Sequence, residues 1–229
     1  MKAFVLAGGL GTRLRPRFGD TPKPLAPLGG QPFLVRQLAA LAGHGIARAV
    51  ILAGHGAAQL QAELGDSASG VALTWSIEPE PLGTGGALKL AERHVDGHVL
   101  VVNGDTLADG DPWAVELERW ERGALGAVAL YEVADARARG RVEVADDGRI
   151  ERFVEKHDAW RGPAWVNGGV YTFAPALWKA IPEGASSLER DVLPGLAAEG
   201  RLHGRRCAGR FWDIGTPEDW ARAEQEFSR

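Results

Sequence analysis

A glycine-rich segment near the start of the chain carries the residues best suited to chemistry. It reads GGLGTRL over Gly8–Leu14 and directly follows Ala3–Ala7, an apolar run that predicts a buried strand. Glycines at such a strand-to-loop turn let backbone N–H groups approach phosphate oxygens, and Arg13 adds a fixed positive charge. Lys23 follows in the same connection between two prolines, which stiffen the chain around it. The segment therefore predicts a site for a phosphorylated ligand.

The same segment has three alternative interpretations: a tight turn without a ligand, a dinucleotide-binding loop, and an ATP-hydrolysing P-loop. The dinucleotide pattern requires a third glycine where Leu14 stands, and a P-loop requires a Gly-Lys-Ser/Thr sequence that does not follow. Glycines alone would favour the plain turn. Arg13 and Lys23 in one connection favour a polyanion site.

The elements that must position this segment alternate between strands and helices. Apolar runs predict strands, and apolar residues at helical spacing predict helices, in the order Ala3–Ala7 (strand), Pro32–Ala42 (helix), Ala49–Ala53 (strand), Val71–Ile77 (strand), Gly85–Arg93 (helix) and His98–Val102 (strand). Continuous apolar strands separated by helices predict a mostly parallel sheet that is covered on both faces. A ligand site is then expected at the carboxyl ends of these strands.

The second half of the chain is richer in strands. The predicted order is Pro112–Arg122 (helix), then Ala124–Val133, Arg141–Val144, Ile150–Glu155 and Trp165–Phe173 (strands). Two further helical patterns, Ser187–Ala198 and Pro217–Phe227, bracket the segments Arg201–Cys207 and Phe211–Gly215. Asp146-Asp147-Gly148 predicts a hairpin turn, and Ser187 and Thr216 are suited to cap helices. We expect one three-layer, Rossmann-like α/β domain over residues 1–229 with a β-rich insertion, its halves being 1–122 and 123–229.

Composition excludes several classes of protein. With 229 residues, 45% hydrophobic and 24% charged, the chain can bury a substantial core and is not a disordered protein. A formal charge of -4 gives no global positive field to recruit nucleic acid, and one cysteine excludes an internal disulfide framework. No apolar run approaches the ~18 residues that a membrane span needs. Because MKAFVLAGG builds no signal peptide, we expect a protein that begins at Met1 and stays in the cytoplasm.

Further motifs follow in order along the chain. They are EPLGTGG (Glu80–Gly86), NGD (Asn103–Asp105), Glu155-Lys156, NGG (Asn167–Gly169) and WDIGT (Trp212–Thr216). With GGLGTRLRP and TPKPL near the start, this series resembles the sugar-nucleotide pyrophosphorylases, the nucleotidyltransferases that join a nucleoside triphosphate to a sugar 1-phosphate. The resemblance covers essentially the whole chain and implies the nucleotide-diphospho-sugar transferase fold.

The resemblance implies that the protein binds a nucleoside triphosphate, a sugar 1-phosphate and Mg²⁺. Arg13, Lys23 and Asp105 are the implied catalytic residues, because they would balance and align phosphate charge. Asp105 and Asp213 would hold Mg²⁺, although each aspartate taken alone is also typical of a turn or a cap. The implied nucleotide-binding residues are Leu6, Gly8, Gly9, Gly11, Thr12, Pro81, Gly83, Thr84, Asn103 and Gly104. Thr84 could at the same time cap a helix.

The sugar-phosphate site is also implied by the resemblance. The implied residues are Gly140, Glu155, Lys156, Asn167 and Gly168. Lys156 offers a point charge for the phosphate and Glu155 can accept hydrogen bonds from vicinal hydroxyls, while exposed strand-edge charges are the alternative interpretation. Many relatives carry an aromatic residue before the glycine that matches Gly140, but this chain has Arg139-Gly140-Arg141. No role follows for either arginine.

Within the family, the chain most resembles the small bacterial D-glycero-D-manno-heptose 1-phosphate guanylyltransferases. It carries the LGTGGA (Leu82–Ala87), NGGVY (Asn167–Tyr171) and SLERD (Ser187–Asp191) runs of that group and no hexapeptide repeats. In the implied reaction, GTP and heptose 1-phosphate give GDP-heptose and pyrophosphate. The GDP-heptose would serve the synthesis of a capsule or surface glycan. Mannose 1-phosphate guanylyltransferase and N-acetylmuramate 1-phosphate uridylyltransferase are the alternatives. A homodimer is compatible with the sequence, but no feature marks an interface.

Two hypotheses come from other classes of protein. A metal-dependent glycosyltransferase also uses a nucleotide-binding α/β sheet, and Asp109-Gly110-Asp111 imitates its paired-aspartate motif. Such an enzyme has no need of a loop carrying Arg13 and Lys23. A catalytically inactive nucleotide sensor is the other hypothesis, and the joint presence of Arg13, Lys23, Asp105 and Asp213 argues against it.

Overall fold

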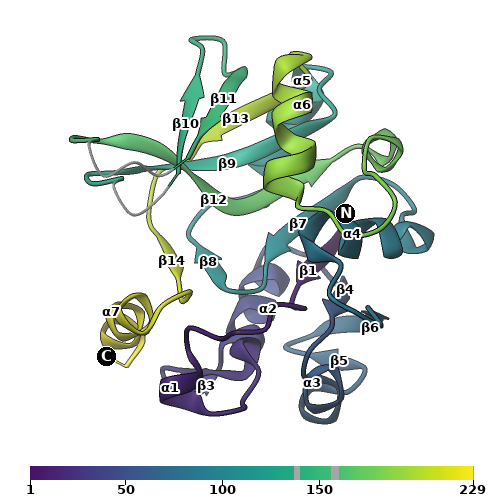
Figure 1. Ribbon diagram of the computed structural model, residues 1–229, viewed down its shortest axis with the longest axis vertical. Coiled ribbons are helices and arrows are strands. Elements are labelled where there is room, and N and C mark those ends of the chain that lie inside the picture. The colour runs from purple at the N-terminus through teal and green to yellow at the C-terminus, as the bar shows by residue number, and fades with distance from the viewer. Residues whose placement is uncertain (137–139, 156–159, 229) are drawn as a thin grey trace.

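An eight-stranded sheet runs through the whole molecule (Figure 1). The computed structural model describes residues 1–136, 140–155 and 160–228. The sheet comprises β1 (Lys2–Leu6), β4 (Arg48–Ala53), β5 (Ser67–Ala68), β6 (Val71–Ile77), β7 (Val99–Asn103), β9 (Gly126–Val133), β12 (Ala164–Phe173) and β13 (Leu202–Arg206), in the spatial order β13-β9-β12-β7-β1-β4-β6-β5. Only β5 and β12 run antiparallel to their neighbours in this sheet, so the predicted mostly parallel arrangement is confirmed.

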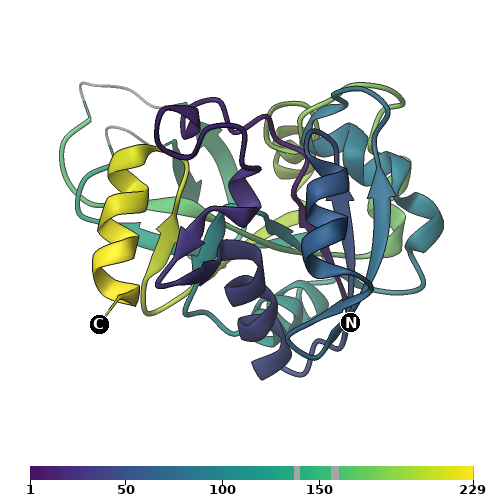
Figure 2. The same ribbon diagram turned by 90° about the horizontal axis from the view of Figure 1, so that it is seen from below.

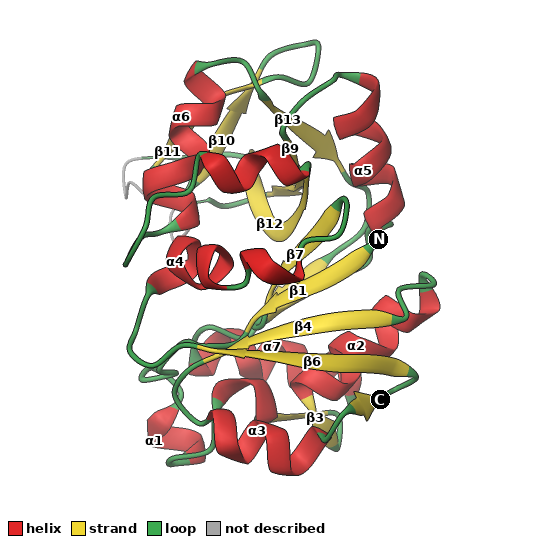
Figure 3. Cartoon of the chain, turned by 90° about the vertical axis from the view of Figure 1, so that its right-hand side faces the viewer, coloured by secondary structure: helices red, strands yellow, loops and turns green. Residues whose placement is uncertain are grey.

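Helices cover both faces of the sheet, which explains its continuous apolar strands. On β7, Leu100 and Val102 pack toward α2 (Phe33–Gly43) and α3 (Ala57–Leu64), whereas Val99 and Val101 pack toward α4 (Gly83–Leu90) and α6 (Leu193–Ala198). Figure 3 shows α2 and α3 below the strands and α4 above them. A further helix, α5 (Pro112–Glu121), packs against β9 through Val115. The three-layer α/β fold class is confirmed.

Most of the β-rich second half extends this same sheet, because β9, β12 and β13 are members of it. The strands β10 (Arg141–Val144) and β11 (Ile150–Val154) form a separate antiparallel ribbon, joined by the predicted turn at 146–148 (Figure 1). Two other ribbons pair β8 (Thr106–Ala108) with β14 (Phe211–Asp213) and β2 (Pro27–Leu28) with β3 (Gln31–Pro32).

The C-terminal helix α7 (Pro217–Phe227) returns to the beginning of the chain. Its Trp220 and Ala223 share an apolar cluster with Leu14 and Leu28, and Figure 2 shows α7 beside the purple N-terminal segment. The short helix α1 (Arg15–Phe18) belongs to that segment, and the remaining short turns are η1 (Lys23–Leu25), η2 (Glu92–His94) and η3 (Pro175–Lys179). Among the described residues, no helix has the length and apolarity to cross a membrane.

Besides the short α1, which was not predicted, two helices differ from the sequence prediction. The helix expected over Ser187–Ala198 is a π turn, η4 (Leu188–Val192), followed by α6. The hydroxyl of Ser187 accepts a hydrogen bond from Arg190 N at 3.2 Å, and that of Thr216 accepts one from Asp219 N at 3.1 Å, so these two predicted caps are confirmed. The suggested cap at Thr84 is wrong, because α4 begins at Gly83 and has no side-chain cap. Helix α3 was not predicted, because it begins after a left-handed Gly56 with no side-chain cap.

Candidate active site

The carboxyl ends of β1, β4, β6 and β7 meet at one edge of the sheet, as predicted. Their loops approach one another at glycines. Gly104 N donates to Leu6 O at 3.0 Å, and a Cβ on Gly104 would lie 2.6 Å from that oxygen. A Cβ on Gly8 would lie 2.6 Å from Oε1 of Glu78. A larger residue at Gly104 would therefore displace backbone, and one at Gly8 would displace the Glu78 side chain.

The glycine-rich loop after β1 encloses a pocket of about 310 Å³. Arg13 stands exposed on the wall of this pocket, and Lys23 and Asp105 line it as well. All three side chains that the sequence implicates in catalysis therefore face one space. Backbone N–H groups with two cationic side chains make this space suited to a triphosphate.

Lys23 and Asp105 form an ion pair inside this pocket. Lys23 Nζ donates to Asp105 Oδ2 at 2.5 Å, and the two side chains are 12% and 33% exposed. Asp105 Oδ1 also accepts from the Thr106 hydroxyl at 3.3 Å. The buried Gln37 fixes the turn that carries Asp105, because its amide donates to Asn103 O at 2.8 Å and Thr106 O at 2.6 Å. Gln37 lies in a predicted helix, and nothing in the sequence marked it.

A second pocket of about 280 Å³ adjoins the first and shares Leu6, Gly9 and Asp105 with it. The first and second pockets together form one groove, the nucleotide groove, whose size suits a nucleotide. The predicted nucleotide-binding residues all line one or both pockets: Leu6, Gly8, Gly9, Gly11, Thr12, Pro81, Gly83, Thr84, Asn103 and Gly104.

The start of α4 is joined to η4 rather than left free for a ligand. The Thr84 hydroxyl donates to Glu189 Oε2 at 2.8 Å and accepts from Leu188 N at 2.8 Å. Gly83 has a φ of +70°, and a Cβ there would lie 2.5 Å from Ser186 O. Thr84 thus lines the second pocket while its hydroxyl is engaged within the protein.

Glu78 is a site residue that sequence reasoning missed. It directly follows β6, lines the second pocket and accepts a hydrogen bond from Leu82 N at 3.1 Å. Burial raises the pKa of the Glu78 carboxyl above its ordinary value of 4.5, and the Leu82 hydrogen bond opposes this shift. The sequence signal that could have found it was its position at the carboxyl end of a parallel strand, which it shares with Asp105.

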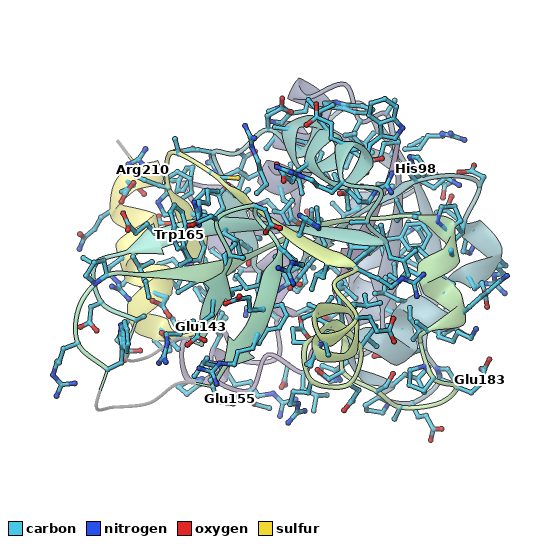
Figure 4. The ribbon with its side chains drawn as sticks, turned by 90° about the horizontal axis from the view of Figure 1, so that it is seen from above. His98, Glu143, Glu155, Trp165, Glu183 and Arg210 are labelled. Atoms are coloured by element: carbon cyan, nitrogen blue, oxygen red, sulfur yellow. The ribbon has the colours of Figure 1, made fainter. Side chains whose placement is uncertain are left out.

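A third pocket of about 330 Å³ contains most of the predicted sugar-phosphate residues that the structure describes. Gly140, Glu155 and Asn167 line it together with Asp213. Figure 4 labels Glu155 at the end of the β10–β11 ribbon, near Glu143. Lys156 and Arg139 lie outside the described residues.

The strand β12 has a bulge between Asn167 and Tyr171, and two of the predicted sugar-phosphate residues, Asn167 and Gly168, lie at this bulge. Asn167 Nδ2 donates to the Tyr171 hydroxyl and its Oδ1 accepts from Gly169 N, both at 2.9 Å. The structure does not place Gly168 on the third pocket: a Cβ there would lie 2.5 Å from the Tyr131 ring. Gly168 therefore has a packing reason to be glycine.

Asp105 and Asp213 come together on the β8–β14 ribbon. Asp213 pairs with Thr106 across the ladder, and Ile214 N donates to Asp105 O at 3.0 Å. Asp213 Oδ1 accepts from Gly215 N at 2.6 Å, and Gly215 lines the first pocket while Asp213 lines the third. The ribbon thus lies between the nucleotide groove and the third pocket.

The two carboxylates at this ribbon are donors of the chemical type that Mg²⁺ takes in proteins. Mg²⁺ is usually held by one or two carboxylates, with water and substrate phosphates as the other ligands. Asp105 and Asp213 supply two carboxylates beside a pocket suited to phosphates. Within the described ranges, no group of three or more His, Cys, Asp or Glu side chains forms a cage that could hold a metal by itself.

The sequence from residue 2 to residue 229 matches the family model of the nucleotidyl transferases. The chain belongs to this family. It is 36% identical to mannose-1-phosphate guanylyltransferase of Mycobacterium tuberculosis over 99% of this chain and 64% of that protein. It is 34% identical to the catalytic subunit beta of mannose-1-phosphate guanylyltransferase from Danio rerio, covering 96% of this chain and 62% of that one. The chain thus spans less than two thirds of these curated relatives.

Two solved structures match this chain over almost its whole length and almost their own whole length. HddC from Yersinia pseudotuberculosis is 31% identical with a TM-score of 0.87, and each chain covers 99% of the other. HddC complexed with GMP-PN is 29% identical with a TM-score of 0.85 and the same coverage. The nucleotide-diphospho-sugar transferase fold inferred from the motifs is confirmed.

The link between α4 and η4 can be tested with Gly83→Ala. We expect the variant to lose about 2–4 kcal/mol of unfolding free energy, because left-handed strain adds to a clash with Ser186. The matched control is Gly70→Ala, since Gly70 has a φ of +80° and no atom within 4 Å of the position that a Cβ would take. It should lose only about 1 kcal/mol, from strain alone. Equal losses in urea unfolding would contradict the proposed importance of this contact.

Proposed function

We propose that the protein transfers a guanylyl group from GTP to a sugar 1-phosphate, giving a GDP-sugar and pyrophosphate. The observation that carries this proposal is the β8–β14 ribbon, which presents Asp105 to the nucleotide groove and Asp213 to the third pocket. A ribbon so placed suits a reaction between two phosphorylated substrates. The names of the curated relatives and the GMP-PN complex of HddC support the choice of activity.

The reaction makes one bond and breaks one. A phosphate oxygen of the sugar 1-phosphate attacks the α-phosphorus of GTP in line, and the bond to the β-phosphate breaks to release pyrophosphate. The nucleophile is already an anion, so the protein needs to align the groups and to balance their charge. Arg13 and Lys23 supply positive charge on the side of the leaving pyrophosphate.

We propose Mg²⁺ as the cofactor, held by Asp105 and Asp213. When bound, the ion would supply further positive charge to the phosphates. The side chains of Arg13 and Lys23 add to that charge from the glycine-rich loop.

The glycosyltransferase hypothesis loses its main support in the structure. Asp111 caps α5, where its Oδ1 accepts from Trp113 N at 2.9 Å. Asp109 Oδ2 accepts from Arg210 N at 3.1 Å. The Asp109-Gly110-Asp111 sequence therefore has structural uses, and neither aspartate lines the nucleotide groove.

Glu78 supports guanine as the base. A carboxylate only accepts hydrogen bonds, and guanine presents two adjacent donors, N1–H and the 2-amino group. Adenine and the pyrimidines do not present this pair. Glu78 lines the second pocket together with Gly8 and Pro81, and its carboxylate accepts a hydrogen bond from Leu82 N.

For the sugar we propose D-glycero-D-manno-heptose 1-phosphate, so that GDP-heptose for a capsule or surface glycan would be the product. The proposal rests on the Leu82–Ala87 and Ser187–Asp191 runs, which resemble those of heptose guanylyltransferases. Mannose 1-phosphate is the alternative sugar, supported by the names of the curated relatives. N-acetylmuramate 1-phosphate with UTP is a further alternative.

One grid of assays tests base and sugar together. Pyrophosphate release is measured with Mg²⁺ for GTP, ATP, CTP, UTP and dTTP, each against the 1-phosphates of heptose, mannose, glucose and N-acetylmuramate. We expect the highest kcat/KM for GTP with heptose 1-phosphate. The highest value for GTP with mannose 1-phosphate would change the sugar only. If no combination of nucleoside triphosphate and sugar 1-phosphate released pyrophosphate, the proposed activity would be overturned.

Lys23→Ala and Asp105→Asn should each lower kcat by about 10²-fold or more, because each removes a charge from the reacting centre. Both variants also break the ion pair between Lys23 and Asp105, so the melting temperature should fall, but each variant should remain folded at the assay temperature. The matched controls are Lys2→Ala and Asp96→Asn, which break an ion pair of 2.8 Å outside the groove. Near-normal kcat in both site variants would contradict their roles.

Glu78→Gln should lower kcat/KM for GTP by about 10–100-fold, the cost of losing charge-assisted hydrogen bonds. The parent should prefer GTP over ITP, which lacks the 2-amino group, and the variant should lose much of that preference. In the parent, kcat/KM for GTP should fall on acidification at a pH above 4.5, because protonating Glu78 removes an acceptor and its pKa is raised. Glu80→Gln, a neighbouring exposed carboxylate, is the control. An unchanged GTP/ITP ratio in Glu78→Gln would exclude the base contact.

A further inference from the structure

The π turn η4 forms part of the wall of the third pocket. Glu189 and Arg190 of this turn line the pocket together with Asp213. π turns are rare and often occur at functional sites, where the extra residue changes the direction of a side chain. The sequence prediction of a regular helix gave these two residues no role.

The backbone of η4 is held in place from several sides. Leu188 N donates to the Thr84 hydroxyl at 2.8 Å, which joins the turn to α4. Ser187 N donates to Asp191 Oδ2 at 2.7 Å, and Arg190 N donates to the Ser187 hydroxyl at 3.2 Å. The backbone of Arg190 is therefore fixed, even though its side chain is exposed.

Glu189 does not neutralise its neighbour. Its Oε2 accepts from the hydroxyls of Thr84 at 2.8 Å and Ser187 at 3.2 Å, and its Oε1 accepts from that of Tyr171 at 3.3 Å. These hydroxyls come from α4, the cap of η4 and β12. The carboxylate is thus committed to joining these elements.

Two arginines of the described chain line this pocket, and they differ in their partners. Arg141 donates to Glu143 Oε1 at 3.2 Å and stacks on the Trp160 ring at 4.2 Å. The Arg190 guanidinium forms no hydrogen bond or ion pair with any residue in the described ranges. Arg190 is therefore the cation of this wall that can be offered to a ligand.

We infer that Arg190 binds the phosphate group of the sugar 1-phosphate. In the proposed reaction this phosphate must lie beside Asp213, and Arg190 lines the same pocket as Asp213. The pocket also holds the carboxylates of Glu155 and Glu189, so a phosphate dianion needs a cationic partner there. A guanidinium can donate two parallel hydrogen bonds to phosphate oxygens, which fixes both position and orientation. Arg190 would act in substrate binding, and this inference rests on the proposed function.

The test uses steady-state kinetics of Arg190→Ala with the sugar 1-phosphate that the wild type turns over best. We expect KM for the sugar 1-phosphate to rise about 10–100-fold, the range for a lost charge-assisted hydrogen-bond pair. KM for GTP should change less than about two-fold, since Arg190 does not line the nucleotide groove. Arg190→Lys keeps the charge but loses the planar fork, so its KM should lie between those of the parent and Arg190→Ala.

Arg201→Ala is the matched control, because Arg201 is an arginine with a 50% exposed side chain outside the pocket, paired with Glu199. It should leave both KM values unchanged. An active wild type with a parental KM for the sugar 1-phosphate in Arg190→Ala would overturn the role of Arg190 alone. Equal rises in both KM values of Arg190→Ala would indicate general damage to the site and would also overturn it. A wild type that is inactive with every sugar 1-phosphate would overturn the proposed function and this inference together.

Discussion

The ion pair between Lys23 and Asp105 is the contact on which the phosphate site depends. It joins the loop after β1 to the turn after β7, two strands that are parallel neighbours in the sheet. Each partner is held by rigid structure: Lys23 begins the turn η1 between two prolines, and the turn of Asp105 is fixed by the buried Gln37. The loop is therefore already shaped when a phosphate arrives, and less ordering is needed on binding.

A chain of hydrogen bonds connects the walls of the nucleotide groove and the third pocket. It runs from Thr84 through Glu189 and Tyr171 to Asn167. Burial and the nearby Glu189 raise the pKa of Tyr171, so its hydroxyl stays protonated and can donate to Glu189 while it accepts from Asn167. Because these hydrogen bonds join the wall of the nucleotide groove to the wall of the third pocket, we expect the two walls to keep a fixed position relative to each other. Such positioning is what a reaction between two bound phosphates requires.

Most of the fold could be predicted from periodicity, because strands buried on both faces are continuously apolar. The residues that the motif resemblance implies for the nucleotide, although scattered along the sequence, all line one groove in the structure. Glu78 was missed because it lies in none of the motifs, although it directly follows the predicted strand Val71–Ile77. Gln37 was missed because its role depends on carbonyls about 70 positions away, at Asn103 and Thr106, which only the folded chain brings near. The π turn that directs Arg190 was likewise predicted as a regular helix, since spacing does not distinguish the two.

The side chains whose pKa is raised by burial are not suited to act as nucleophiles in this protein. Burial raises the pKa of the Tyr131 and Tyr171 hydroxyls and of the Cys207 thiol, so each of these groups stays protonated. A protonated phenol or thiol is a poor nucleophile. In the proposed reaction, Arg13, Lys23 and the carboxylates would therefore contribute position and charge, and the attacking oxygen would come from a substrate that is already ionised. A sugar 1-phosphate meets that requirement without a general base. The positions of the nucleotide groove and the third pocket on the two sides of the β8–β14 ribbon therefore matter more here than any single reactive side chain.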